Sequence, residues 1–236
     1  MTLILATATA SEMRAVLTGF NGRGRVGCVM PEEGQPVVSP VNECECILLV
    51  TGVGPVNAAF QLGRTLAANK RIEGVVNLGI GGSFDMEKAP LCHGVLVDSE
   101  TWPDYGLATT EGTSAEALRF PLHQDDAGTV WNRIDLAPVA SLHTLGLSVP
   151  EHSAIGGALT VAAASGHPAR AEEMCAHGAL IENMEGFALA LGCRKAGLPF
   201  VEYRIVSNRV GSRAAVDWAL DDAFTALGKA ARALFC

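Results

Sequence analysis

Three side chains follow apolar segments of the sequence and could take part in chemistry on a small molecule. Glu12 comes shortly after the apolar run at residues 3–7, Glu185 lies within "IENMEGFALA", and Asn208 closes "FVEYRIVSN". A carboxylate can act as a general base or accept two hydroxyl hydrogen bonds, whereas a neutral amide donates as well as accepts. Each residue also has a structural interpretation: Glu12 and Glu185 could stabilise helix starts, and Asn208 could cap a strand or helix end.

Two glycine-rich segments each follow an apolar run. The first, "LLVTGVGPVNAA", is typical of a strand, a tight turn and a helix, with Gly52 and Gly54 in the turn. A dinucleotide site also needs an acid at the end of the second strand, and Glu73 precedes its strand instead. The second segment is "NLGIGGSF". Two such turns at one sheet edge predict a small-ligand site rather than a dinucleotide site, with turns that bind nothing as the alternative.

The cysteine and histidine residues do not predict a metal site or a nucleophile. The seven cysteines contain no C-x-x-C pair, so we expect small buried side chains in a reducing cytoplasm. The six histidines show no ligand spacing, and no G-x-S-x-G motif accompanies them, which argues against a serine hydrolase. We therefore expect neither a metal nor a cofactor.

Composition excludes several classes of protein. The chain has 236 residues, of which 49% are hydrophobic and 18% charged, so it is not a disordered chain. Its net charge of -8 does not attract nucleic acid or an anionic membrane. No apolar run approaches the ~18 residues of a membrane span, and the N-terminus lacks the basic region of a secretory signal. We expect one cytoplasmic domain spanning residues 1–236, with a small molecule as its partner.

Short apolar runs alternate with segments of helical period, which is typical of an α/β fold. We expect helices beginning at Pro55, near Met184 and near Val216, each with apolar residues recurring on one face. The segment 101–136 is irregular and holds two of the three tryptophans, so it predicts a lid, an interface or a helix that the pattern hides. The expected strands, several of them continuous apolar runs suited to the centre of a sheet, span residues 3–7, 25–30, 46–53, 74–78, 94–98, 155–162 and 199–207.

Five segments, taken in order, resemble one superfamily along nearly the whole chain: "ATATASEMRAVL", "TGVGPVNAA", "NLGIGGSFD", "NMEGFALA" and "RIVSNRVG". It comprises the purine nucleoside phosphorylases and the methylthioadenosine nucleosidases, which cleave the N-glycosidic bond of nucleosides. The resemblance implies a three-layer α/β sandwich with a central mixed β-sheet flanked by helices. It also implies a homo-oligomer, a dimer or larger, in which the region 102–107 is the candidate for contact with a partner chain. Within the superfamily, "TGVGPVNAA", "MEG" and "SNRVG" are most similar to the futalosine hydrolases, which release hypoxanthine from futalosine in menaquinone biosynthesis.

The resemblance implies roles for four residues. The glutamate after the first strand activates the attacking water in related nucleosidases, and Glu12 occupies that place. The methionine and glutamate of the M-E motif hold the ribose, which assigns that role to Met184 and Glu185. The residue after the serine of the late strand contacts the base at N7, and here it is Asn208.

The second glycine segment distinguishes a hydrolase from a phosphorylase. The resemblance implies that Ile80 and Gly81 border the sugar and the base through their backbone. Hexameric phosphorylases of the superfamily hold phosphate with an arginine and a serine that flank this turn. Asn77 and Ile80 stand at those places here, so the resemblance predicts water rather than phosphate as the attacking group.

Two features depart from the related nucleosidases. Their base-stacking aromatic has no counterpart in "LTVAAASGHPAR", so Phe84 or Phe187 is expected to pack against the base instead. Futalosine also carries a benzoate-bearing tail at its 5′ end. Its carboxylate needs a cation, for which Arg209 and Arg213 are the candidates, with solvation or pairing to Asp217 as the alternative.

The amide of Asn208 predicts which purine is cut. Hypoxanthine presents two acceptors, N7 and O6, whereas adenine presents N7 beside an amino donor. An asparagine NH₂ can donate to N7 or O6, and an ionised aspartate would repel O6. The leading hypothesis is therefore futalosine hydrolysis. The alternatives are another purine nucleosidase of this fold, acting on methylthioadenosine, adenosylhomocysteine or inosine, and a non-catalytic nucleoside-binding protein.

Overall fold

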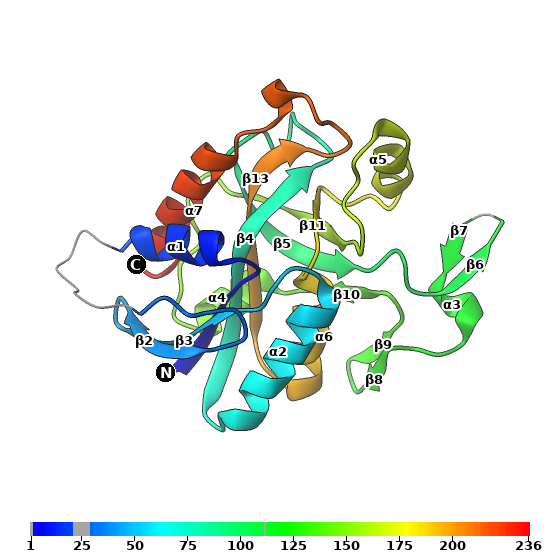
Figure 1. Cartoon of the computed structure of the whole chain (residues 1–236). Helices are drawn as coiled ribbons and strands as arrows, with labels where there is room; N and C mark the ends of the chain where they lie inside the picture. The colour runs from blue at the N-terminus through cyan, green and yellow to red at the C-terminus, as the bar shows by residue number, and fades with distance from the viewer. Residues whose placement is uncertain (1, 21–28, 111) are drawn as a thin grey trace.

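One large mixed β-sheet organises the molecule (Figure 1). The computed structural model describes residues 2–20, 29–110 and 112–236. Nine strands of the described chain form this sheet, in the order β10-β5-β11-β12-β4-β1-β3-β2, and β13 pairs with both β4 and β5. The strands are β1 (Thr2–Thr7), β2 (Val37–Val41), β3 (Cys44–Val50), β4 (Ile72–Ser83), β5 (Gly94–Thr101), β10 (Arg133–Asp135), β11 (Ala154–Thr160), β12 (Ile181–Asn183) and β13 (Phe200–Arg209).

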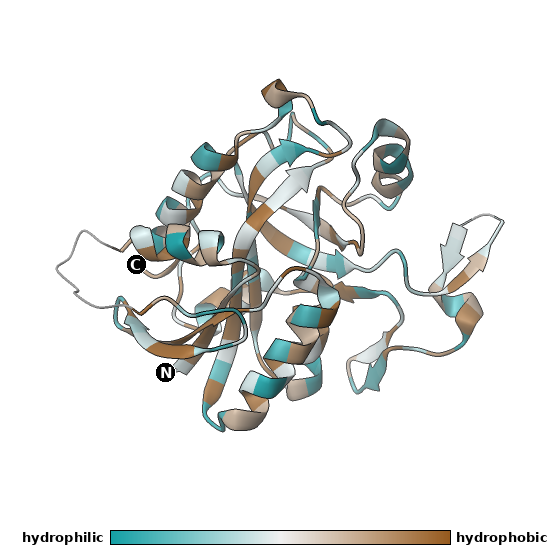
Figure 2. Cartoon of the chain, viewed as in Figure 1, coloured by the Kyte–Doolittle hydropathy of each residue, from teal (hydrophilic) through white to brown (hydrophobic). Residues whose placement is uncertain are grey.

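Helices cover both faces of the sheet, as the continuous apolar strands predict. In β1, Leu3 and Leu5 pack in one core with residues of α1, α4 and α7, whereas Ile4 and Ala6 pack in another with α2 and α6. Figure 2 shows hydrophobic colouring along the middle of the sheet, and hydrophilic residues between hydrophobic ones on the helices. The helices are α1 (Ala10–Thr18), α2 (Pro55–Ala68), α3 (Ala115–Leu118), α4 (Pro138–Thr144), α5 (Pro168–Cys175), α6 (Gly186–Ala196) and α7 (Leu220–Leu234).

Parallel pairing places the strand ends that precede the predicted site residues at one edge of the sheet. Strands β3 and β4 are both parallel to β1, and β13 is parallel to β4. Their carboxyl ends therefore meet at the same edge. Gly52 and Gly54 follow β3 there with φ angles of 82° and 95°, so they form the tight turn expected before Pro55. The α/β architecture with a central mixed sheet is confirmed.

Several predicted boundaries need correction. The "NLGIGGSF" segment is not a turn, because β4 continues through it to Ser83 while β13 pairs alongside. The late helix begins at Leu220, since Val216 lies in a separate short 3-10 turn, Ala215–Asp217. Sequence analysis missed three strands of this sheet, β2, β10 and β12. The predicted strand at 25–30 falls mostly on residues 21–28, outside the described residues.

The irregular segment at 101–136 forms two small hairpins that project away from the sheet (Figure 1). They consist of β6 (Leu107–Thr109) with β7 (Gly112–Ser114), and β8 (His123–Asp125) with β9 (Gly128–Val130). Only the four residues of α3 are α-helical in this part of the described chain. No helix of the described residues is long and apolar enough to cross a membrane.

Candidate active site

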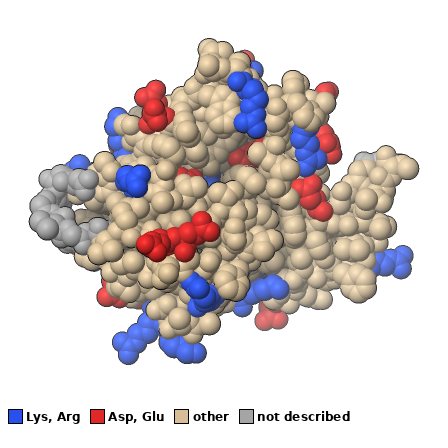
Figure 3. Space-filling model, viewed as in Figure 1, with Lys and Arg blue, Asp and Glu red and all other residues tan. Residues whose placement is uncertain are grey.

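A cavity of about 440 Å³ opens at the sheet edge where β1, β4 and β13 end. This volume is within the range of small-molecule sites. Figure 3 shows a hollow near the centre of this face, with acidic atoms visible in it and charges of both signs scattered around. Six residues predicted from the sequence line the cavity: Glu12, Ile80, Gly81, Met184, Glu185 and Asn208.

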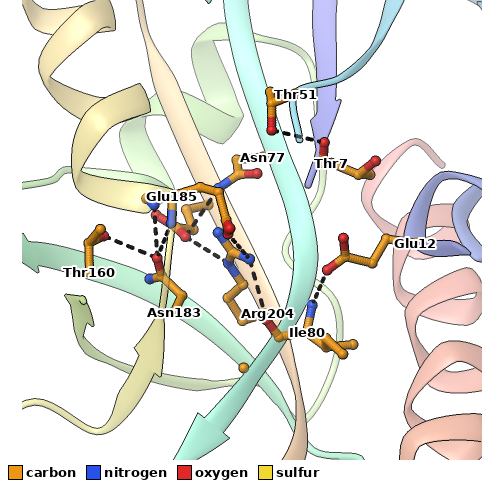
Figure 4. Close-up of polar contacts among 12 residues, drawn as sticks. Thr7, Glu12, Thr51, Asn77, Ile80, Thr160, Asn183, Glu185 and Arg204 are labelled. Atoms are coloured by element: carbon orange, nitrogen blue, oxygen red, sulfur yellow. Dashed lines mark hydrogen bonds and ion pairs between the residues drawn. The ribbon is translucent and has the colours of Figure 1, made fainter. Parts of the chain in front are cut away.

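The start of α1 places Glu12 at the wall of the cavity. Thr9 is the N-cap of α1, and its backbone N–H and hydroxyl both donate to Glu12 Oε2 at 2.8 Å. The other carboxylate oxygen accepts from the Ile80 backbone N–H at 3.0 Å (Figure 4). Burial raises the pKa of Glu12, although the Arg204 guanidinium and the Ile80 N–H oppose the rise. A raised pKa makes this carboxylate a better general base near neutral pH.

Glu185 stands at the N-cap position of α6, with its carboxylate turned toward the first glycine turn. The Gly54 backbone N–H donates to Oε1 at 3.1 Å, and Oε2 lies 3.3 Å from Arg204 NH1. The helix start itself is satisfied by Asn183, whose side-chain oxygen accepts from the N–H groups of Glu185 and Gly186. Because Asn183 caps the helix, the Glu185 carboxylate is not needed for capping and can accept hydrogen bonds from hydroxyl groups.

Arg204 connects the two glutamates, and sequence analysis did not identify it. Its side chain is 1% exposed, and NH1 donates to the Ile80 carbonyl as well as to Glu185 (Figure 4). A Cβ on Gly79 would lie 2.6 Å from Arg204 NH1 and 2.7 Å from Glu12 Oε1, so both groups approach the same backbone position. The carboxylates of Glu202, Glu185 and Glu12 raise its pKa against the effect of burial. The available signal was a charged pair inside the apolar run "FVEYRIVS".

A β-bulge lies near the end of β13, where Ser207 and Asn208 line the cavity. The register with β4 shifts between Val206 and Asn208, which leaves Ser207 as the extra residue. The Ser207 hydroxyl lies 2.9 Å from Asn208 Oδ1 and 3.2 Å from the Gly81 carbonyl. The hydroxyl has one proton and donates to one of these two acceptors at a time, whereas the donor group of the Asn208 amide is its NH₂. It donates to the Arg209 carbonyl at 3.2 Å, which uses one of its two protons.

Three predicted residues lie outside the cavity lining: Phe84, Phe187 and Arg209. Phe187 is 2% exposed and packs against Trp102, in the core that the sheet forms with α2 and α6. Arg209 lies outside the cavity lining and pairs with Asp217 at 3.2 Å, which is the alternative that the sequence left open. Arg213 does line the cavity, with its guanidinium carbon 5.5 Å from the Trp218 ring centre.

At the position where the resemblance places a phosphate-binding residue of the phosphorylases, the side chain of this protein is buried. Asn77 is 1% exposed and donates to Glu202 Oε1 at 3.2 Å (Figure 4). Ile80 contributes its backbone N–H, which is occupied by Glu12. No cluster of histidine, cysteine, aspartate or glutamate among the described residues is arranged to hold a metal ion.

Comparison with known proteins gives relatives along nearly the full chain, although no family model matches. The chain is 32% identical to the futalosine hydrolase of Streptomyces coelicolor over 238 residues, covering 96% of this chain and 92% of that one. Among solved structures, a methylthioadenosine/adenosylhomocysteine nucleosidase from Helicobacter pylori has a TM-score of 0.73 at 18% identity, over 98% and 95% of the two chains. A futalosine hydrolase from Helicobacter pylori has a TM-score of 0.72 at 16% identity, over 98% and 94%. At this identity the structures bear on the fold alone.

Proposed function

The chain belongs to the futalosine hydrolase family, and from this we propose that it hydrolyses the N-glycosidic bond of futalosine. The products would be hypoxanthine and dehypoxanthine futalosine, a step of menaquinone biosynthesis. The observation that carries this proposal is that two buried glutamates, Glu12 and Glu185, line one cavity. Both carboxylate oxygens of Glu12 accept hydrogen bonds, one from Thr9 and the other from Ile80. Asn77, at the expected phosphate position, is buried and donates to Glu202 instead.

We propose that Glu12 activates the attacking water. Cleavage passes through an oxocarbenium-like centre, which nearby carboxylates stabilise. Water then needs a base, and the raised pKa of Glu12 suits that task. Met184 and Glu185 hold the ribose, with the carboxylate of Glu185 accepting from the diol.

Asn208 would donate to N7 or O6 of the base, beside the backbone of Ile80 and Gly81. The contact for the tail carboxylate falls to Arg213 rather than Arg209, because Arg213 lines the cavity. The predicted packing of Phe187 against the base is replaced by packing of Trp218, which also lines the cavity.

The test is incubation with futalosine in the absence of phosphate, followed by chromatography for free hypoxanthine. We expect release by the wild-type chain. Glu12→Gln should lower kcat by about 10²–10⁴-fold while the variant still binds a substrate analogue, because the amide cannot accept the proton. Strict dependence on phosphate would contradict hydrolysis. If Glu12→Gln turned over at the wild-type rate, another residue would be the base. If the wild-type chain bound a nucleoside but released no hypoxanthine, it would be a nucleoside-binding protein.

A second candidate is a nucleosidase for methylthioadenosine, because a structure of that class shares the fold. Asn208 separates the two, since the related reaction requires a group that accepts from the 6-amino position. Side-by-side turnover of futalosine and methylthioadenosine decides between them.

We also propose that the protein is a homo-oligomer. Helix α2 exposes apolar side chains on its outer face, where Val56 is 80% exposed and Phe60 is 63% exposed. Phe60 borders an apolar depression that continues onto Trp102 and α6. Val53, at the start of this face, also lines the active-site cavity. A partner chain seated on α2 would therefore reach the rim of the cavity.

A further inference from the structure

Two acidic side chains that the proposed reaction does not use lie beside the active site. Glu100 of β5 and Glu202 of β13 are both 0% exposed. A Cβ added to Gly186 would collide with Glu100 Oε1 and with both carboxylate oxygens of Glu202. The two carboxyl groups therefore approach each other at the first residue of α6, directly after Glu185.

The two carboxyl groups have different partners. Glu202 Oε1 accepts from Arg204 Nε at 2.8 Å and from the Asn77 amide at 3.2 Å. Glu100 accepts only from neutral groups among the described residues, Thr160 at 2.8 Å and Asn183 at 2.6 Å. One charged donor thus faces Glu202, and none faces Glu100. The remaining oxygen of Glu202, Oε2, is buried without a described donor.

Electrostatics at this position favour a single shared proton. Glu12 and Glu185 already face the one guanidinium of Arg204, and a dry interior does not hold two further ionised carboxylates beside them. Burial and the charge of Glu202 raise the pKa of Glu100 well above its ordinary value. A proton on Glu100 supplies the donor that Glu202 Oε2 lacks.

We propose that Glu202 is the positioning residue of the reaction, holding Arg204 between Glu185 and Glu12 with one negative charge, and that Glu100 is its protonated partner. The proposal rests on the proposed function, in which Glu12 is the base and Glu185 holds the ribose. Through Arg204, Glu202 sets how strongly the guanidinium stabilises the ionised form of Glu12. The charged groups that face Glu12 are Arg204 on β13 and Glu185 at the start of α6.

The sign of the effect follows from this arrangement. Glu202→Gln removes a negative charge and leaves the Arg204 charge less neutralised, and both changes favour ionised Glu12. The pKa of Glu12 therefore falls, and the acidic limb of kcat moves to lower pH by about one unit. At neutral pH kcat falls about tenfold, because Glu12 is a weaker base and Arg204 is less firmly oriented.

The experiment measures kcat against pH with futalosine for the wild type, Glu202→Gln, Glu100→Gln and the double variant. Hypoxanthine release by the wild type first establishes the proposed function independently. The acidic midpoint should stay in place in Glu100→Gln, since the amide replaces a group that is already neutral. It should fall in Glu202→Gln, and at least as far in the double variant, where Glu100 cannot take up the charge. A wild-type midpoint in the double variant, or a shift in Glu100→Gln as large as in Glu202→Gln, would overturn the proposal.

A second measurement needs no activity and applies if Glu202→Gln does not fold. The pKa of Glu100 is raised in the folded state, so its contribution to stability is present at low pH and is lost as pH rises above 4.5. Glu100→Gln lacks this loss. The difference in unfolding free energy between Glu100→Gln and the wild type should therefore grow in favour of the variant from about pH 5 to pH 8. Parallel curves would refute the assignment of the proton to Glu100.

Discussion

At the scale of the residue, we expect Asn208 to determine which base is cut. Its oxygen lies 2.9 Å from the Ser207 hydroxyl, and its NH₂ donates to the Arg209 carbonyl, which leaves one N–H for a substrate. An NH₂ donor matches a 6-oxopurine, whose N7 and O6 both accept. The same position in a nucleosidase for a 6-aminopurine needs a group that can accept from the amino group. We therefore expect a single functional group at the end of β13 to decide between the two bases.

Asn208→Asp should shift the preference toward the 6-amino base. An aspartate can accept from the amino group and, when ionised, repels O6. The ratio of kcat/KM for methylthioadenosine to that for futalosine should rise about 10- to 100-fold, the effect of a hydrogen bond to a charged group. Arg209→Gln is the matched control, because its side chain lies next in the chain but outside the cavity lining. An unchanged ratio in Asn208→Asp would refute this account of base selection.

At the scale of elements, the start of α6 lies against the buried carboxyl groups of Glu100 and Glu202. Asn183 caps the helix, Glu185 is the proposed ribose acceptor, and Gly186 has no side chain, all within four residues. Gly186 is needed because the carboxyl groups of Glu100 and Glu202 occupy the space of a side chain. The M-E-G motif thus joins a proposed binding residue to the one residue type that lets the buried acids approach.

Gly186→Ala should destabilise the protein, because its Cβ would collide with buried carboxyl oxygens that cannot move away. We expect a loss of about 1–3 kcal/mol in the free energy of unfolding, measured by chemical denaturation. Gly63→Ala in α2 is the control, since its Cβ meets nothing within 4 Å. That substitution should stabilise the helix by up to about 1 kcal/mol. Equal effects of the two substitutions would contradict the steric role of Gly186.

At the scale of the whole molecule, the apolar stripe of α2 faces away from the core. The sequence places Val56, Ala59, Phe60 and Gly63 on one face, and in the structure this face is exposed. The helix instead buries Ala58, Leu62 and Thr65 against the sheet. An apolar stripe that the protein's own core does not use is typical of an interface. Trp102, which begins the predicted contact region 102–107, lines the same apolar depression.

Phe60→Glu should weaken the homo-oligomer, because a charge would be buried between apolar surfaces. Sedimentation velocity over a range of protein concentrations measures the effect, and the dissociation constant should rise at least about 100-fold. Val139→Glu on α4 is the control, since Val139 is also exposed, at 54%, but lies on another helix. A wild-type chain that sediments as a monomer would contradict the proposed assembly.

The sequence by itself determined the fold class, the family and six of the residues that line the cavity. Strand period and glycine turns suffice for the sheet edge, because the apolar pattern and the need for positive φ are local properties. Glu12, Glu185 and Asn208 were found from their places beside predicted strands and helices, whereas Ile80, Gly81 and Met184 were found from the family resemblance. The single-domain organisation and the roles of these residues stay predictions.

Only the tertiary structure decided which charges meet. Glu100 and Glu202 come from two strands that pair antiparallel, and no local pattern shows that their carboxyl groups meet at Gly186. Nor does a local pattern show that Arg204 meets Glu185 at the start of α6. The same holds for Phe187 and Arg209, whose spacing suits a ligand but whose neighbours direct them into the core and toward Asp217. The "GIGG" segment also became a strand through its pairing with β13. Long-range pairing decides these points, because the energy of a buried charge depends on partners distant in sequence.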